Sequence, residues 1–350
     1  MRINSQYYLP RYCIIAENAL DEIPKVTREF QTKTSVSIVC DDITRKIAGE
    51  RVSSILSDEG IELTEHVITD SSIQEAQKLI DFSSKAKTRL IFAVGGGSVI
   101  DVAKYAGFQL GIPFVSVPTA VSHDGIASPT ASLTGVKHKE SFPARAPYAI
   151  VVDLDIIRKS PMQLTVSGCA DVLSNRSAVL DWRLAQRIKG EIVDKTAEGL
   201  ALLAYQLVAN NVDTVVRQDP NGFELLVKAI INSSLSMCVA GSSRPASGSE
   251  HLISHALDRI PDNKLLHGLQ VGLTSILTLY LHDADWEEFR SILRKIGSPT
   301  TLKETGIGYD DFINAMCLAH TIRPDRYTIL GERGVSESAA KRALEDTGIA

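Results

Sequence analysis

The sequence is poor in cysteine and has no closely spaced cysteine pair. The five cysteines are odd in number and lie far apart, at Cys13, Cys40, Cys169, Cys238 and Cys317. Without paired spacing, neither a disulfide framework nor a cysteine-ligated zinc site is indicated. We expect these side chains to serve as small buried hydrophobic groups.

The chain also lacks an excess of basic residues and a run of apolar residues long enough to span a bilayer. Lysine and arginine number 37 against 42 acidic residues, a net charge of -5, and the charges are interspersed. This pattern disfavours a nucleic-acid partner. The best apolar run, residues 269–281, is shorter than the roughly 20 residues that a spanning helix needs, and the opening MRINSQYYLPRY has no apolar signal core. We expect a cytoplasmic protein with no integral membrane segment.

The chain divides into two halves with different hydrophobic patterns. With 350 residues and 44% hydrophobic side chains, it is long enough for two cores. After Pro161 the strand signals vanish and helical periodicity follows. Before it, short β-branched runs alternate with helical stretches, in the order 36–42, 43–56, 62–68, 72–85, 89–96, 98–110, 114–119 and 148–153. We therefore predict an α/β domain with a mostly parallel, Rossmann-like sheet over residues 1–158 and an all-α domain over 159–350, with a ligand cleft between them.

A glycine-rich turn is the strongest motif of the first half. In RLIFAVGGGSVIDVAK, residues 89–104, a buried strand runs into three glycines and Ser98 then opens a helix. Backbone N–H groups and the positive end of the helix converge there, as a pyrophosphate requires. The spacing is not GxGxxG, because position 100 is Ile, so a plain tight turn is an equal alternative. Asp101 could bond a ribose or cap the helix.

Acidic residues after the first strand of the series bear on the choice of nucleotide. Asp41 and Asp42 end VSIVCDD, where a carboxylate can accept from an adenosine ribose hydroxyl, although acidic turn residues are common without a ligand. Such a carboxylate favours NAD, whereas the nearby Arg45 and Lys46 could tolerate the extra phosphate of NADP. We expect both nucleotides to be used.

A long polar loop follows the strand at 114–119. Residues 116–132, SVPTAVSHDGIASPTAS, exceed the usual connection of about two to six residues, and long polar loops at strand ends commonly carry binding groups. The alternative is a flexible surface loop. We favour function, since the loop follows the glycine turn in the same sheet.

Three of the eight histidines fall within residues 248–268, GSEHLISHALDRIPDNKLLHG. His251 and His255 are four apart and share a helix face. Position 252 is Leu, so the HExxH pattern of a metallopeptidase fails. His267 begins the next helical stretch, and two imidazoles with one carboxylate form an open metal site. Asp171, in the small-residue segment SGCADVLSN, is the candidate carboxylate. Spacing alone leaves open that these are surface histidines and a helix-capping Asp.

The motifs together resemble those of the glycerol-1-phosphate dehydrogenases, archaeal enzymes of the polyol and iron-containing alcohol dehydrogenase superfamily with a dehydroquinate synthase-like fold. The resemblance covers nearly the whole chain in the same order, and HDGIASP and SEHLISH are more specific than the glycine turn. The segments that carry it are GGGSVIDVAK, PTAVSHDGIASP, GCADVLSN, GSEHLISHALD, LHGLQVG and RPDRYTIL.

The resemblance implies reversible reduction of dihydroxyacetone phosphate to sn-glycerol 1-phosphate with NAD or NADP as cofactor, for archaeal ether phospholipid biosynthesis. It implies one divalent metal, zinc, on Asp171, His251 and His267, and a homo-oligomer. It implies substrate contacts at Asp124, Asp171 and His255, with Asp171 and His255 in catalysis. Nucleotide contacts are expected at Asp41, Gly96, Gly97, Ser98, Val99, Ile100, Asp101, Thr119, Ala120, Val121, Ser122 and Ser128.

Several alternatives remain open at this point. Glycerol dehydrogenase or a dehydroquinate-synthase-like lyase could use the same scaffold, since a fold does not fix a reaction. A nucleotide sensor without catalysis would leave the three metal-ligand candidates unexplained. Nickel or iron suits the same ligands as zinc. Arg323 and Arg326, in RPDRYTIL, are candidates for phosphate recognition, with solvated surface arginines as the alternative.

Overall fold

The computed structural model describes residues 7–30, 35–135, 139–217, 219–261 and 263–350. The chain separates into two compact units, Met1–Pro161 and Met162–Ala350. The division falls three residues after the boundary that we placed at residue 158. The predicted fold class is confirmed: an α/β unit is followed by a helical one.

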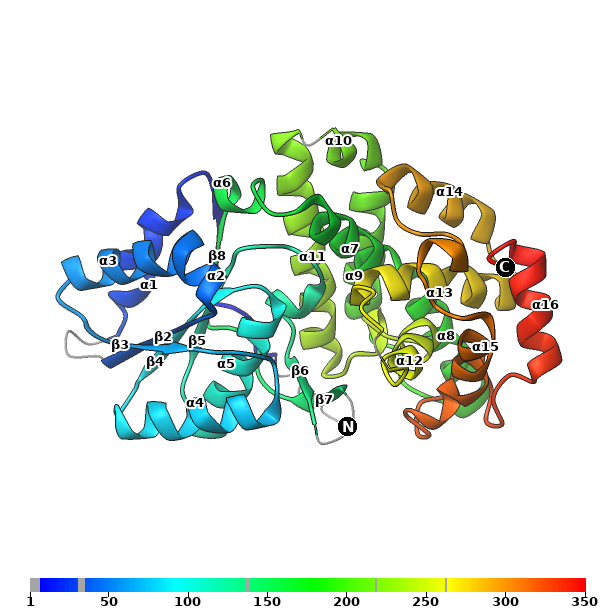
Figure 1. The fold of residues 1–350 in the computed structure, drawn as a ribbon, viewed down its shortest axis with the longest axis horizontal. Helices are drawn as coiled ribbons and strands as arrows, with labels where there is room; N and C mark the ends of the chain where they lie inside the picture. The colour runs from blue at the N-terminus through cyan, green and yellow to red at the C-terminus, as the bar shows by residue number, and fades with distance from the viewer. Residues whose placement is uncertain (1–6, 31–34, 136–138, 218, 262) are drawn as a thin grey trace. The chain divides into compact units, whose positions relative to one another are not determined.

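Unit 1 is built on a six-stranded sheet with the strand order β1-β8-β5-β4-β2-β3, in which every neighbouring pair is parallel. Helices α1 and α3 cover one face and α4 and α5 cover the other (Figure 1). The strands are β1 (Tyr12–Ala16), β2 (Ser35–Cys40), β3 (Glu62–Val67), β4 (Leu90–Gly95), β5 (Phe114–Pro118) and β8 (Ala149–Asp153). The helices are η1 (Ala19–Glu22), α1 (Ile23–Thr27), α2 (Asp42–Thr44), η2 (Arg45–Gly49), α3 (Glu50–Asp58), α4 (Ile73–Lys85), α5 (Gly97–Leu110), η3 (Asp124–Ile126) and α6 (Leu154–Ile157).

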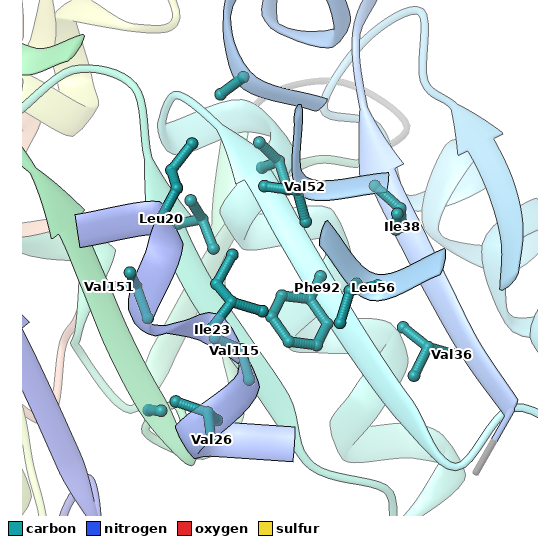
Figure 2. Packing of buried hydrophobic residues seen from close by; sticks show 14 of the residues in the cluster. Leu20, Ile23, Val26, Val36, Ile38, Val52, Leu56, Phe92, Val115 and Val151 are labelled. Carbon is teal, nitrogen blue, oxygen red and sulfur yellow. The ribbon is translucent and has the colours of Figure 1, made fainter. Parts of the chain in front are cut away.

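The core of unit 1 follows from continuous apolar strands. All side chains of β2, β4, β5 and β8 are buried, as expected when a parallel sheet is covered on both faces. On one face Phe92 lies at the centre of the packed side chains (Figure 2). Around it are Leu20, Ile23 and Val26 from η1 and α1, Val52 and Leu56 from α3, and Val36, Ile38, Val115 and Val151 from the neighbouring strands.

Strand β1 and a two-stranded hairpin in unit 1 were not predicted from the sequence. Strand β1 pairs with β8, with Tyr12 opposite Ala149, although no strand was expected before residue 36. The polar loop is also more structured than we expected, because its end joins an antiparallel hairpin of β6 (Thr130–Thr134) and β7 (Lys139–Pro143).

Unit 2 contains helices and no strand among its described residues. Helix α11 is long and apolar enough to span a membrane by length and composition, but 61% of its most apolar window is buried and it packs on α9, as a core helix does. The helices are α7 (Met162–Leu173), α8 (Asn175–Lys189), α9 (Lys195–Ala209), α10 (Val212–Val216), α11 (Pro220–Ala240), η4 (Arg244–Ala246), α12 (Ser249–Leu257), α13 (His267–Leu281), α14 (Trp286–Ile296), η5 (Leu302–Glu304), α15 (Tyr309–Leu318), η6 (Ala319–Thr321) and α16 (Glu337–Thr347).

Candidate active site

Unit 2 brings Asp171, His251 and His267 together from three helices. Asp171 lies in α7, His251 in α12, and His267 is the first residue of α13. One potential ligand atom from each lies within 4.8 Å of the other two. Asp171 Oδ1 is 3.7 Å from His251 Nε2 and 3.9 Å from His267 Nε2. Ligand atoms on a tetrahedral zinc are about 3.4 Å apart, so small movements would bring all three onto one ion.

The close approach of α13 to α7 depends on Gly268. A Cβ atom at this residue would lie 2.0 Å from the carbonyl oxygen of Ser167, so no larger residue fits without a shift of the backbone. Ser167 precedes Asp171 by four residues and therefore lies on the same face of α7. Gly268 thus lets His267, its neighbour in sequence, reach the Asp171 carboxylate.

Buried carboxylates fix the start of α12 and the orientation of His251. Asp181, in α8, accepts hydrogen bonds from the backbone N–H and the hydroxyl of Ser249, at 2.6 and 2.5 Å. Glu250 accepts from the backbone N–H of Gly248 at 2.6 Å, and its Oε1 is 2.9 Å from His251 Nδ1. Because Glu250 contacts Nδ1, the other ring nitrogen of His251, Nε2, faces Asp171. A carboxylate that contacts the second ring nitrogen commonly orients metal-ligating histidines in this way.

The two histidines differ in burial, which matters for metal binding. Burial, followed by the positive charges of His255, Arg326 and Arg323, lowers the pKa of His251 well below its ordinary value, so its imidazole is neutral and retains a lone pair. His267 Nδ1 is 3.4 Å from the Ser254 hydroxyl. The His267 side chain is 26% exposed and that of Asp171 only 2%, so a small molecule has access from the His267 side.

His255 lies beside this group without belonging to it. Its ring stacks on that of His267, with centroids 5.8 Å apart, and its centroid is 6.3 Å from that of His251. His255 Nδ1 is buried, has no hydrogen-bond partner, and lies 3.6 Å from Asp258 Oδ2.

The three glycines of the glycine-rich turn, Gly95, Gly96 and Gly97, have different structural surroundings. A Cβ at Gly95 would lie 2.5 Å from Val99 Cγ2, so this residue is needed for packing of the strand against the helix. A Cβ at Gly97 would lie 2.1 Å from His123 Nε2. A Cβ at Gly96 would meet nothing within 4 Å. Gly96 is therefore the residue beside open space, at the N-cap of α5, where backbone N–H groups can bind a phosphate.

A fully buried lysine, which the sequence analysis overlooked, joins α5 to the polar loop. Lys104 Nζ donates to Asp101 Oδ1 at 2.9 Å and to the carbonyls of Gly125 and Thr130 at 2.7 Å each, and it is 3.3 Å from Ser128 Oγ. Asp101 and Ser128, two expected nucleotide contacts, thus lie close together, and both contact Lys104. The signal was present in the sequence, since Asp101 and Lys104 are three apart on one helix.

The remaining expected nucleotide contacts differ in exposure. Ser98 is exposed, and Gly97 and Ser122 are partly so, whereas the side chains of Val99, Ile100, Thr119, Ala120 and Val121 are buried. Asp41 caps α2: its Oδ1 accepts from the backbone N–H groups of Ile43 and Thr44 at 2.9 and 2.7 Å. Arg45 donates to Glu65 at 2.7 Å, which reduces its availability for a nucleotide phosphate.

His123 is a second residue whose role was not anticipated. Its Nδ1 accepts from the Gly125 N–H at 2.9 Å, and its ring covers Gly97. Burial lowers the pKa of His123 to about 4, so the ring is neutral near pH 7. Asp124, an expected substrate contact, follows it and begins η3, where it is partly buried.

Comparison with known proteins first defines the class. Residues 14–161 match the family model described as iron-containing alcohol dehydrogenase. The structure is similar to glycerol dehydrogenase from Schizosaccharomyces pombe, with a TM-score of 0.81 and 21% identity over 98% of this chain and 90% of that one. It is also similar to NADH-dependent butanol dehydrogenase A from Thermotoga maritima, with a TM-score of 0.74 and 18% identity over 98% of both chains. At these identities the likeness shows the fold.

Curated relatives then define the particular family. The glycerol-1-phosphate dehydrogenase [NAD(P)+] of Pyrococcus horikoshii is 41% identical over 97% of this chain and 98% of the relative. That of Methanosarcina acetivorans is 43% identical over 97% and 96%. The chain belongs to the glycerol-1-phosphate dehydrogenase family, and the resemblance noted from its sequence motifs is confirmed.

Proposed function

We propose that this protein catalyses the reversible, NAD(P)H-dependent reduction of dihydroxyacetone phosphate to sn-glycerol 1-phosphate. Family membership supports the oxidoreductase class and the nucleotide. The observation that carries the proposal is the convergence of Asp171, His251 and His267, which a nucleotide sensor would not need.

The ligand atoms suit a divalent ion, for which we propose zinc. One carboxylate and two neutral imidazoles are a common donor set of catalytic zinc, leaving a position open for substrate. An ion held there supplies Lewis-acid stabilisation of the negative charge that develops on a carbonyl oxygen as hydride arrives. The residues of this chain orient the donors: Glu250 holds His251, and Ser254 lies behind His267.

We assign substrate and proton roles to His255, in unit 2, and a substrate role to Asp124, in unit 1. His255, whose ring lies beside those of His251 and His267, binds a substrate hydroxyl or supplies the proton that the alcohol product needs. Asp124 contributes a further substrate contact, and Gly96, Gly97 and Ser98 bind the pyrophosphate of NAD or NADP. We further propose a cytoplasmic homo-oligomer whose product enters phospholipid biosynthesis.

The test compares NADH and NADPH oxidation with dihydroxyacetone phosphate and with unphosphorylated dihydroxyacetone, before and after EDTA treatment. We expect chelator-sensitive turnover of the phosphate ester with both nucleotides. Turnover of dihydroxyacetone alone would instead indicate a glycerol dehydrogenase. Inactivity towards both after zinc reconstitution would refute the proposal. A His255→Ala enzyme that kept full kcat/KM across pH would remove His255 from both assigned roles.

A further inference from the structure

Two arginines of unit 2 converge on one serine hydroxyl. Arg323 Nη1 donates to Ser243 Oγ at 3.2 Å, and Arg326 Nη2 donates to the same oxygen at 2.9 Å. Arg326 Nη1 also donates to the Ser247 carbonyl at 2.6 Å. Both side chains are partly buried. They therefore differ from the fully solvated surface arginines that were the alternative.

The charges of this pair are not neutralised within the described part of the chain. No carboxylate there lies within 4.0 Å of either guanidinium; Asp325 and Glu250 act on them only from farther away. The contrast is Arg244, whose guanidinium binds both carboxylate oxygens of Glu191. Burial, followed by repulsion from Arg323 and Arg244, lowers the pKa of Arg326 to about 9. Holding two such cations together costs free energy that an anion would recover.

The pair lies at the same end of α12 as the metal centre. Ser247, which Arg326 holds, comes two residues before α12, and His251 is the third residue of that helix. Ser247 and Gly248 are not helical, so the rise per residue is at most about 3.6 Å before the helix and 1.5 Å within it, and the two points are at most about 10 Å apart along the chain. The charges of Arg323 and Arg326 accordingly act on His251.

The geometry points to Arg323 and Arg326, with Ser243 between them, as the subsite that binds the phosphate of the substrate. This inference rests on the proposed function, and it names the groups that distinguish a phosphorylated ketone from an unphosphorylated one. Two guanidiniums match the double charge of a phosphate monoester better than the single charge of a carboxylate. The Ser243 oxygen accepts from both arginines, which leaves its own hydrogen to donate to a phosphate oxygen.

The experiment uses the zinc-loaded protein and two readouts. The first is the affinity for inorganic phosphate, by calorimetry, and the second is the ratio of kcat/KM for dihydroxyacetone phosphate to that for dihydroxyacetone. In Arg323→Gln and Arg326→Gln we expect both quantities to fall about tenfold to hundredfold, the effect of removing a charge-assisted hydrogen bond. Arg323→Lys should recover part of the affinity, because the charge remains while the planar donor pair is lost.

Matched controls separate binding from folding. Arg333→Gln removes an exposed arginine of the same region and should change both readouts less than about twofold. Arg326 also donates to the Ser247 carbonyl, so Arg326→Gln can disturb folding. If it does, Arg323→Gln and Ser243→Ala test the phosphate subsite in its place. A structural role alone would lower kcat/KM for both ketones together and leave their ratio unchanged.

Failure of this inference differs from failure of the proposed function. If the wild-type protein reduces dihydroxyacetone phosphate but Arg323→Gln and Ser243→Ala keep wild-type phosphate affinity and selectivity, the subsite is refuted and the function stands. If the wild type binds phosphate through this pair without reducing the ester, the function is refuted and the subsite stands. A wild type that binds no inorganic phosphate overturns the subsite.

Discussion

Glu250 Oε1 lies 2.9 Å from Nδ1 of His251, and the Glu250 side chain is fully buried. A carboxylate behind a ligating imidazole fixes its tautomer and makes its other nitrogen a better donor. We expect Glu250→Ala to weaken zinc affinity about tenfold to hundredfold, and Glu250→Gln to weaken it less, because an amide oxygen can still accept from Nδ1. Competition with a chromophoric chelator measures both values.

The control for this prediction is Glu198→Gln. Glu198 is also nearly buried, but its carboxylate pairs with Arg183 and Lys195 rather than with a candidate metal ligand. Its replacement should lower stability and leave zinc affinity unchanged. Equal loss of zinc affinity in the Glu198 and Glu250 variants would assign the effect to general destabilisation.

Replacement of Asp171 tests the metal centre itself. Asp171→Asn keeps the size of the side chain but removes the charge that lies 3.7 and 3.9 Å from the two imidazoles. We expect bound zinc to be lost at micromolar concentrations and kcat/KM to fall at least about a hundredfold. Metal analysis of the purified variant and steady-state kinetics measure the two effects. Full activity in a variant without metal would contradict a metal-dependent mechanism.

Lys104 allows a stability prediction for unit 1. Lys104→Met leaves the Asp101 carboxylate and the Gly125 and Thr130 carbonyls without their buried partner. We expect the free energy of unfolding to fall by about 3 to 5 kcal/mol, measured by urea denaturation. The double variant Asp101→Asn/Lys104→Met should recover part of this loss. Lys78→Met, at an exposed lysine paired with Glu75, should cost less than about 1 kcal/mol.

His123 predicts a pH dependence of stability. Its pKa is about 4 in the folded chain against 6.5 as the ordinary value, so between these values the unfolded chain binds more protons. Above about pH 6.5 the titration of His123 does not reduce the free energy of unfolding. As the pH decreases from 6.5 towards 4, this free energy falls by up to about 1.4 kcal/mol per pH unit for one proton. In His123→Asn, which can still accept from the Gly125 N–H, this contribution should disappear. Chemical denaturation at several pH values compares the slopes, and identical slopes would contradict the assignment.

The glycine turn yields a comparison of neighbouring positions. Gly97→Ala places a methyl group where the His123 ring lies, whereas the same change at Gly96 meets open space. We expect Gly97→Ala to lower the free energy of unfolding by about 1 to 3 kcal/mol, and Gly96→Ala to leave it nearly unchanged. If a phosphate binds beside Gly96, Gly96→Ala should nevertheless weaken NADH binding, measured by fluorescence titration.

The elements that the sequence predicted are those with strong local signals. The alternation of strands and helices is visible in residues 36–153, and the candidate ligands Asp171, His251 and His267 converge as proposed. Strand β1 was missed because YCIIA is a run of only five residues and its partner, β8, lies far along the chain. Glu250 and Lys104 were missed because only tertiary contacts bury them. The spacing of Asp101 and Lys104 indicates an ion pair on a helix, but not that the pair is buried.

The strand order of unit 1 also constrains how the chain can be assembled during synthesis. Among the strands that the structure describes, β1 has β8 as its only neighbour in the sheet, and β8 is the last of them to be made. The segment Tyr12–Ala16 therefore lacks its native partner until residue 153 has left the ribosome, because it pairs with β8 in the finished sheet. Once β5 has been made, at Pro118, the half-made sheet also exposes the edge of β5 that later pairs with β8. A nascent chain stalled before residue 149 thus carries both an unpaired strand and an open sheet edge, the features that recruit chaperones.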